Sequence, residues 1–98
     1  MRLEAVIDWV VRSDRRRRVL GCLDQPLTAR QISRRTDLFL GACSYVLGEF
    51  LAKRLAACLN DGARRGRVYW LTESGLLCQR HLREEAGLPP ITGEFPVV

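Results

Sequence analysis

Histidine and lysine are almost missing from this 98-residue sequence, which contains one of each, His81 and Lys53. A lone histidine without an evident nucleophile beside it is more often a structural or surface residue than a catalytic one. Glycine-rich phosphate loops, paired-carboxylate motifs and metal-ligand spacings are missing as well. We therefore expect that the protein is not an enzyme and needs no cofactor and no metal ion.

Closely spaced cysteines are also lacking. The four cysteines stand far apart and form no C-x-x-C motif: Cys22, Cys43, Cys58 and Cys78. Metal sites usually need such pairs or a nearby histidine. We interpret these residues as reduced, mostly buried thiols that fill space as small apolar side chains. A redox- or metal-sensing pair brought together by folding remains the alternative.

Long apolar segments are lacking too. The longest uncharged run extends from Leu38 to Gly48 and is far shorter than the roughly 20 residues of a membrane helix. Near the N-terminus, Glu4 and Asp8 interrupt any signal-peptide core. We expect a cytoplasmic protein with no membrane partner. Hydrophobic residues nevertheless make up 47% of the chain, which is enough for the core of one domain.

Positive charge is abundant and unevenly placed. The net charge is +5, and all basic residues but Lys53 are arginines, whose planar guanidinium groups match phosphate geometry. Residues 28–72 hold eight basic and three acidic side chains, a local charge of +5. A polyanion could be bound there. A solvated basic surface explains the same numbers, so charge alone does not decide between the two.

The N-terminal third predicts two helices. In residues 3–12, apolar side chains recur on one helical face: Leu3, Val6, Ile7, Val10 and Val11. Trp9 falls on the opposite face, and an exposed tryptophan suggests an interface, so we expect a homodimer through this helix. Ser13 or Asp14 is a suitable N-cap for a second helix, Arg15 to Leu23, which Pro26 keeps from continuing.

The middle of the chain predicts two further helices joined by a turn. Thr28 and Gln31 have the spacing of a capping box, so a short helix should run from Ala29 to about Arg35. After a turn at residues 36–38, a longer helix should run from Phe39 to Leu55. Its expected buried face holds Cys43, Leu47, Phe50, Leu51 and Leu55. Its expected outward face holds Gly41, Tyr45, Gly48, Glu49 and Ala52.

The last third predicts a β-hairpin and a helix. Residues 57–59 and 67–71 are the strand candidates, and the loop between them is rich in turn residues and arginine. Thr72 should cap a helix over residues 73–86, and residues 87–98 form an irregular tail rich in proline and glycine. The prediction is a mostly helical α+β domain over residues 1–86, a helical bundle with a two-stranded β-hairpin.

Residues 28–75 resemble the DNA-binding core of bacterial and archaeal winged helix-turn-helix regulators of the ArsR and MarR type. The matching segments are LTARQISRRTDL, CSYVLGEFLAKRL and RRGRVYWLTESG. The resemblance implies a helix-turn-helix over residues 28–55, a wing over 56–71 and extra helices at both ends. The family usually has glycine at the position of Arg54, and its recognition helices are usually more polar than residues 38–48.

The resemblance implies that the chain binds double-stranded DNA as a transcriptional regulator. The expected phosphate contacts come from the wing and the first helix of the motif: Arg64, Arg65, Arg67, Thr28, Arg30, Arg34 and Arg35. The second helix would face the major groove with Gly41, Ser44, Tyr45, Glu49 and Lys53. The alternative is an adaptor that binds another protein through this weakly polar face.

Overall fold

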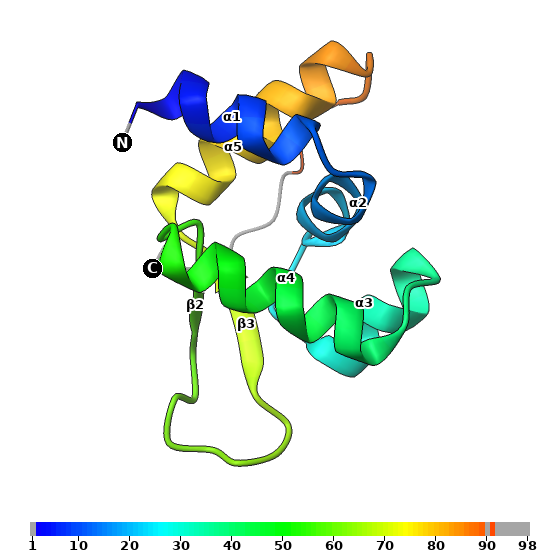
Figure 1. Cartoon of the computed structure of the whole chain (residues 1–98), viewed down its shortest axis with the longest axis vertical. Helices are drawn as coiled ribbons and strands as arrows, with labels where there is room; N and C mark the ends of the chain where they lie inside the picture. The colour runs from blue at the N-terminus through cyan, green and yellow to red at the C-terminus, as the bar shows by residue number, and fades with distance from the viewer. Residues whose placement is uncertain (1, 90, 92–98) are drawn as a thin grey trace.

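A computed structural model describes residues 2–89 and 91. In chain order its elements are α1 (Leu3–Val11), α2 (Asp14–Cys22), β1 (Leu27–Thr28), α3 (Ala29–Thr36), α4 (Leu40–Ala52), β2 (Ala56–Cys58), β3 (Val68–Leu71) and α5 (Glu73–Glu85). The predicted class, a mostly helical α+β fold, is confirmed (Figure 1). Most of the predicted irregular tail lies outside the described residues.

Three helices begin at the capping residues that the sequence predicts. The side chain of Ser13 accepts a hydrogen bond from the backbone N–H of Arg16, and Thr72 accepts one from Gly75. Thr28 and Gln31 form the complete capping box at the start of α3. Caps satisfy backbone N–H groups that have no partner within the helix, so each fixes where its helix starts.

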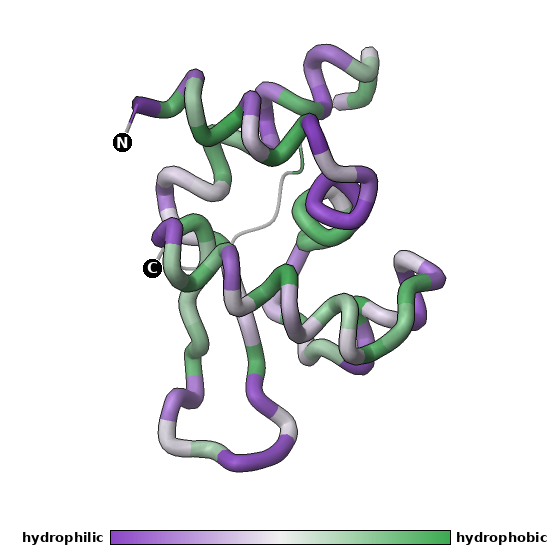
Figure 2. Tube along the Cα trace, in the orientation of Figure 1, coloured by the Kyte–Doolittle hydropathy of each residue, from purple (hydrophilic) through white to green (hydrophobic). Residues whose placement is uncertain are grey.

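The sheet has three antiparallel strands in the order β1-β3-β2, so the prediction of a two-stranded hairpin is incomplete. The added strand is short: Leu27 pairs with Tyr69, and Thr28 pairs with Val68. This pairing links the start of α3 directly to the hairpin. In Figure 1 the two long arms of the hairpin project away from the helices, and Figure 2 shows that the connecting loop is largely hydrophilic.

The fourth helix ends earlier than predicted, at Ala52 instead of Leu55. Arg54 adopts a left-handed backbone conformation, with φ at 59°, which stops the helix without a glycine. Leu55 is buried but belongs to the turn that leads into β2, and its backbone carbonyl accepts a hydrogen bond from the backbone of Thr72. Val46 is a core residue of α4 that the predicted buried face omits.

The core joins all five helices to the sheet. Its largest fully buried side chains include Phe50, Leu20, Leu23 and Ile32. Buried polar residues include Thr36 and Gln79. The side-chain amide of Gln79 in α5 donates hydrogen bonds to the carbonyls of Leu20 and Leu23 at the end of α2. No helix in the described part of the chain is both long enough and apolar enough to cross a membrane.

The prediction that Trp9 is exposed on the far side of α1 is wrong. Its ring lies edge-on to Phe50, with ring centroids 6.1 Å apart, and the guanidinium of Arg16 stacks 4.0 Å from its centre. Two members of the expected buried stripe, Leu3 and Val11, are instead exposed. Compared with the prediction, α1 is therefore turned about its own axis, so that Trp9 packs against α4. Trp9 is not an exposed residue that would suggest a dimer interface.

Candidate nucleic-acid interface

A groove of about 590 Å³ lies between the N-terminal ends of α3 and α4 and the loop that links β2 to β3. We call it the cationic groove, because three elements from distant parts of the sequence bring polar and basic side chains to it. The predicted site residues that line it are Thr28, Arg30, Ser44, Arg64, Arg65 and Arg67. The structure thus places much of the predicted DNA-binding set along one surface.

Asn60 holds the loop that carries three of these arginines. Its side chain donates a hydrogen bond to the carbonyl of Gly66 and accepts one from the backbone N–H of Val68, at 3.0 and 2.7 Å. Gly66 has a positive φ of 63°, which a glycine adopts without strain. The Asn-Asp-Gly sequence predicts a turn, but the positioning role of Asn60 was not predicted.

Arg64 and Arg65 are the loop residues best suited to bind an external anion. Both are exposed, and neither has an ion-pair or hydrogen-bond partner within residues 2–89 and 91. Arg30, at the start of α3, is likewise exposed and unpaired within that part of the chain. Guanidinium groups without internal partners keep all their donors for phosphate oxygens.

Arg67 differs from its two neighbours because the hairpin already uses its side chain. It lies 2.9 Å from the carboxylate of Asp61, and its Nε donates to the Cys58 sulfur at 3.3 Å. The hydrogen bond to Cys58, together with the nearby Tyr69, raises the pKa of Arg67 above its ordinary value. The group is therefore charged, but Asp61 offsets part of that charge.

The two arginines near the end of α3 lie outside the cationic groove. Arg34 is exposed, whereas Arg35 pairs with Asp24 at 2.5 Å. The pairing holds Arg35 against the turn that precedes β1. Of the three arginines predicted on this helix, Arg30 is the one that the groove includes.

The outward face of α4 is exposed at Gly41, Ser44 and Tyr45, as predicted, but not at Glu49. Both carboxylate oxygens of Glu49 bind Arg16 of α2, at 2.9 and 3.4 Å, and the Glu49 side chain is 22% exposed. The prediction that Glu49 lies on the outward face is therefore wrong, because α2 crosses this part of α4.

The structure adds an apolar surface that the predictions did not single out. Phe39, the residue before α4, is 87% exposed, and Leu40 in the first turn is 43% exposed. Leu40 also lines the cationic groove beside Ser44. The run Leu38-Phe39-Leu40 holds more large apolar side chains than one helix start can bury. This run was the feature of the sequence from which the exposed apolar surface could have been predicted.

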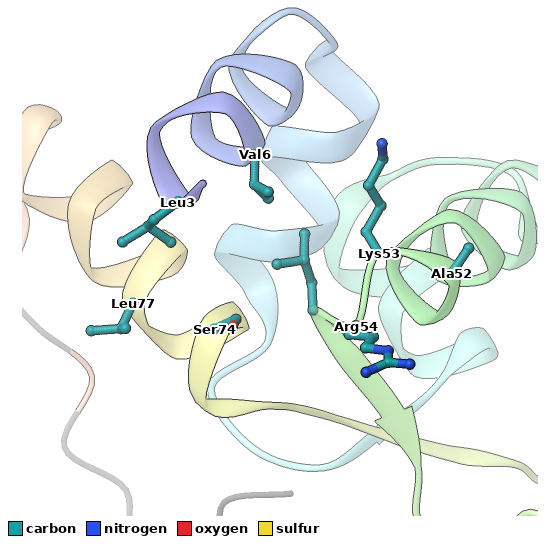
Figure 3. A pocket seen from close by; sticks show the side chains of 8 residues that line it. Leu3, Val6, Ala52, Lys53, Arg54, Ser74 and Leu77 are labelled. Atoms are coloured by element: carbon teal, nitrogen blue, oxygen red, sulfur yellow. The ribbon is translucent and has the colours of Figure 1, made fainter. Parts of the chain in front are cut away.

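Lys53 lies away from the cationic groove, although it was predicted to contact DNA. Its ammonium is 5.0 Å from the centre of the Trp9 ring. Lys53 lines a second groove, of about 570 Å³, between α1, the end of α4 and α5. Figure 3 shows Lys53 and Arg54 at one side of this groove and Leu3 and Leu77 at the other.

The four cysteines are free thiols. Cys43 and Cys78 are buried, and Cys22 and Cys58 are half-buried. Burial raises the pKa of Cys22 and of Cys78 to about 11, so both are protonated at neutral pH. No group of three or more histidine, cysteine or acidic side chains within the described ranges is arranged to hold a metal ion.

His81 lies on the exposed side of α5. Its Nε2 is 3.6 Å from a carboxylate oxygen of Glu85, one helical turn further along. The side chains of both residues are largely exposed. The pair has the spacing of an ordinary surface contact on a helix.

Neither a protein-family model nor a curated protein matches this chain. The cationic groove is therefore the feature from which a function has to be inferred.

Proposed function

We propose that the chain is a winged helix-turn-helix protein that binds double-stranded DNA as a transcriptional regulator. In this proposal α3 and α4 form the helix-turn-helix, and the hairpin of β2 and β3 is the wing. The observation that carries the proposal is the convergence of Arg30, Arg64 and Arg65, all exposed, on one groove next to the exposed face of α4. Such an arrangement suits phosphates on both sides of a DNA groove.

The N-terminal end of α3 strengthens the proposed phosphate site. Thr28 caps this helix at the edge of the cationic groove, and Arg30 follows in the first turn. Helix N-termini favour anions because their N–H groups and the helix dipole point toward them. A DNA backbone that crosses this end would meet both the dipole and the guanidinium.

A titration of the protein with mixed-sequence duplex DNA at several salt concentrations tests the proposal. Each phosphate neutralised should contribute about −0.9 to the slope of log affinity against log salt. We expect measurable binding at ~50 mM salt and a clear negative slope. Absence of binding to any duplex at that salt concentration would contradict the proposal.

A protein-binding adaptor is the second candidate, and the exposure of Phe39 and Tyr45 favours it. These side chains are 87% and 72% exposed, and aromatic residues are enriched in protein interfaces. A pull-down with wild type and Tyr45→Ala distinguishes the candidates. In the adaptor, the substitution abolishes a protein contact and leaves DNA binding unchanged.

A further inference from the structure

The exposed face of α4 carries no charged side chain. The exposed positions along the helix are Leu40, Gly41, Ser44, Tyr45, Gly48 and Ala52. Glu49, the one acidic residue of α4, is bound to Arg16. Three large apolar or aromatic side chains are exposed around the first turns of α4: Phe39 just before the helix, and Leu40 and Tyr45 within it. We call the surface that these three form the apolar face.

The apolar face adjoins the cationic groove. Leu40 belongs to both, and Ser44, one turn after Leu40, lines the groove with Arg64 and Arg65. A duplex whose phosphates contact these arginines would therefore lie next to the apolar face. Gly41 has no side chain to keep a duplex away, and the space beside it is open, since a Cβ atom added there would meet no protein atom within 4 Å.

The side chains on this face exclude the usual ways of reading bases. Two-pronged recognition of guanine needs Arg or Lys, and that of adenine needs Asn or Gln. The exposed positions of α4 hold none of these residues. The feature of the major groove that apolar side chains can recognise is the C5-methyl group of thymine.

We propose that the apolar face reads thymine methyl groups in the major groove, with Phe39 and Tyr45 as the residues that determine specificity. This inference rests on the proposed function, since it requires that the chain binds DNA. The flanking arginines supply affinity that does not depend on sequence. The apolar face supplies the preference, so binding sites should be defined by the positions of their thymines.

Two duplexes that differ only in the methyl group test the inference. Alternating dA–dT and alternating dA–dU copolymers have the same hydrogen-bonding edges, and uracil lacks the C5-methyl group. Burial of one such group changes affinity about fourfold. We therefore expect wild type to bind the thymine copolymer about fourfold more tightly for each methyl group contacted.

Two variants show which surface reads the methyl group. In Phe39→Ala/Tyr45→Ala the ratio of the two affinities should fall to about one, and circular dichroism should be unchanged because both side chains are exposed. In Arg64→Ala/Arg65→Ala, binding to both copolymers should weaken equally, which preserves the ratio.

The possible failures are distinct. Equal binding of both copolymers by wild type overturns the inference but leaves the proposal of DNA binding intact. The apolar face would then be better explained as a contact surface for another protein. A thymine preference that survives Phe39→Ala/Tyr45→Ala also overturns it, because another surface then reads the methyl group. Binding to neither copolymer overturns the proposed function itself.

Discussion

Thr28 and Val68 are paired across β1 and β3, although α3, α4 and β2 lie between them in the chain. Thr28 is also the N-cap of α3. One residue therefore fixes the start of that helix and attaches it to the end of β3 that adjoins the connecting loop. Arg30 and the loop arginines share a groove because of this attachment.

Removing the two unpaired loop arginines should weaken DNA binding without affecting the fold. For Arg64→Ala/Arg65→Ala, the salt slope should flatten by about 0.9 for each phosphate that is no longer neutralised, and the free energy of unfolding should change by less than about 0.5 kcal/mol. Fluorescence anisotropy at several salt concentrations measures the slope. Arg35→Ala is the matched control, because Asp24 already pairs with Arg35. An unchanged slope in the double variant would remove the loop from the interface.

A methyl group added at Gly41 should reduce DNA binding while leaving the protein at least as stable. Alanine is a better helix former than glycine by up to about 1 kcal/mol, and the space around Gly41 is open. Gly21→Ala in α2 is the control, since the space around Gly21 is equally open and this residue does not lie on α4. Thermal unfolding and a DNA titration of both variants give the comparison. Equal affinities for the two variants would place α4 away from the duplex.

Loss of the Gln79 amide should destabilise the protein. Gln79→Leu leaves the carbonyls of Leu20 and Leu23 without these donors, at a cost of about 1–3 kcal/mol for an unsatisfied buried group. Chemical denaturation measures the change in the free energy of unfolding. The neighbouring Arg80 is exposed, so Arg80→Leu should have little effect. A Gln79→Leu protein as stable as wild type would show that these bonds contribute nothing net.

Trp9→Ala should destabilise the protein instead of dissociating a dimer. The substitution removes the ring that contacts Phe50 and Arg16, at a cost of about 2 kcal/mol, below the range for fully buried tryptophans. Light scattering and denaturation of the same samples separate the two effects. A variant that becomes monomeric at unchanged stability would restore Trp9 to a subunit interface.

Alkaline pH should weaken the fold through its buried thiols. The pKa of Cys78 rises from an ordinary 9.0 to about 11 in the folded state, so the unfolded chain loses this proton first. The stabilising contribution is complete below pH 9.0 and is lost as the pH rises toward about 11. Denaturation series at several pH values should therefore show a shallower alkaline decline for Cys78→Ala than for wild type. If the free energy of unfolding of the two proteins declines identically with pH, the pKa of Cys78 is the same in the folded and the unfolded state.

Local signals in the sequence predicted much of the fold. Ser13, Thr28 and Thr72 cap helices because a cap depends on residues three positions away, all visible in sequence. Strand β1 has no such signal. Leu27 and Thr28 are extended because β3 lies beside them, and that contact is set by the folded chain.

The candidate site was predictable in its charges but not in their pairing. The arginines stand out in sequence, yet which of them stay free depends on which acidic side chains the fold brings to them: Asp24 pairs with Arg35, and Asp61 pairs with Arg67. The same holds for Glu49, whose partner Arg16 comes from another helix. Helical periodicity places Trp9 on a face of α1 but cannot say which neighbouring helix covers that face.

The contacts of Trp9 make its indole an optical reporter of how α1, α2 and α4 are assembled. Unfolding removes Arg16 and Phe50 from the ring and exposes it to water, which should shift its emission to longer wavelength. Trp70 is also buried, at 3% exposure. Since neither indole lines the cationic groove, DNA should leave the emission wavelength nearly constant, and one fluorescence spectrum can separate ligand binding from loss of structure.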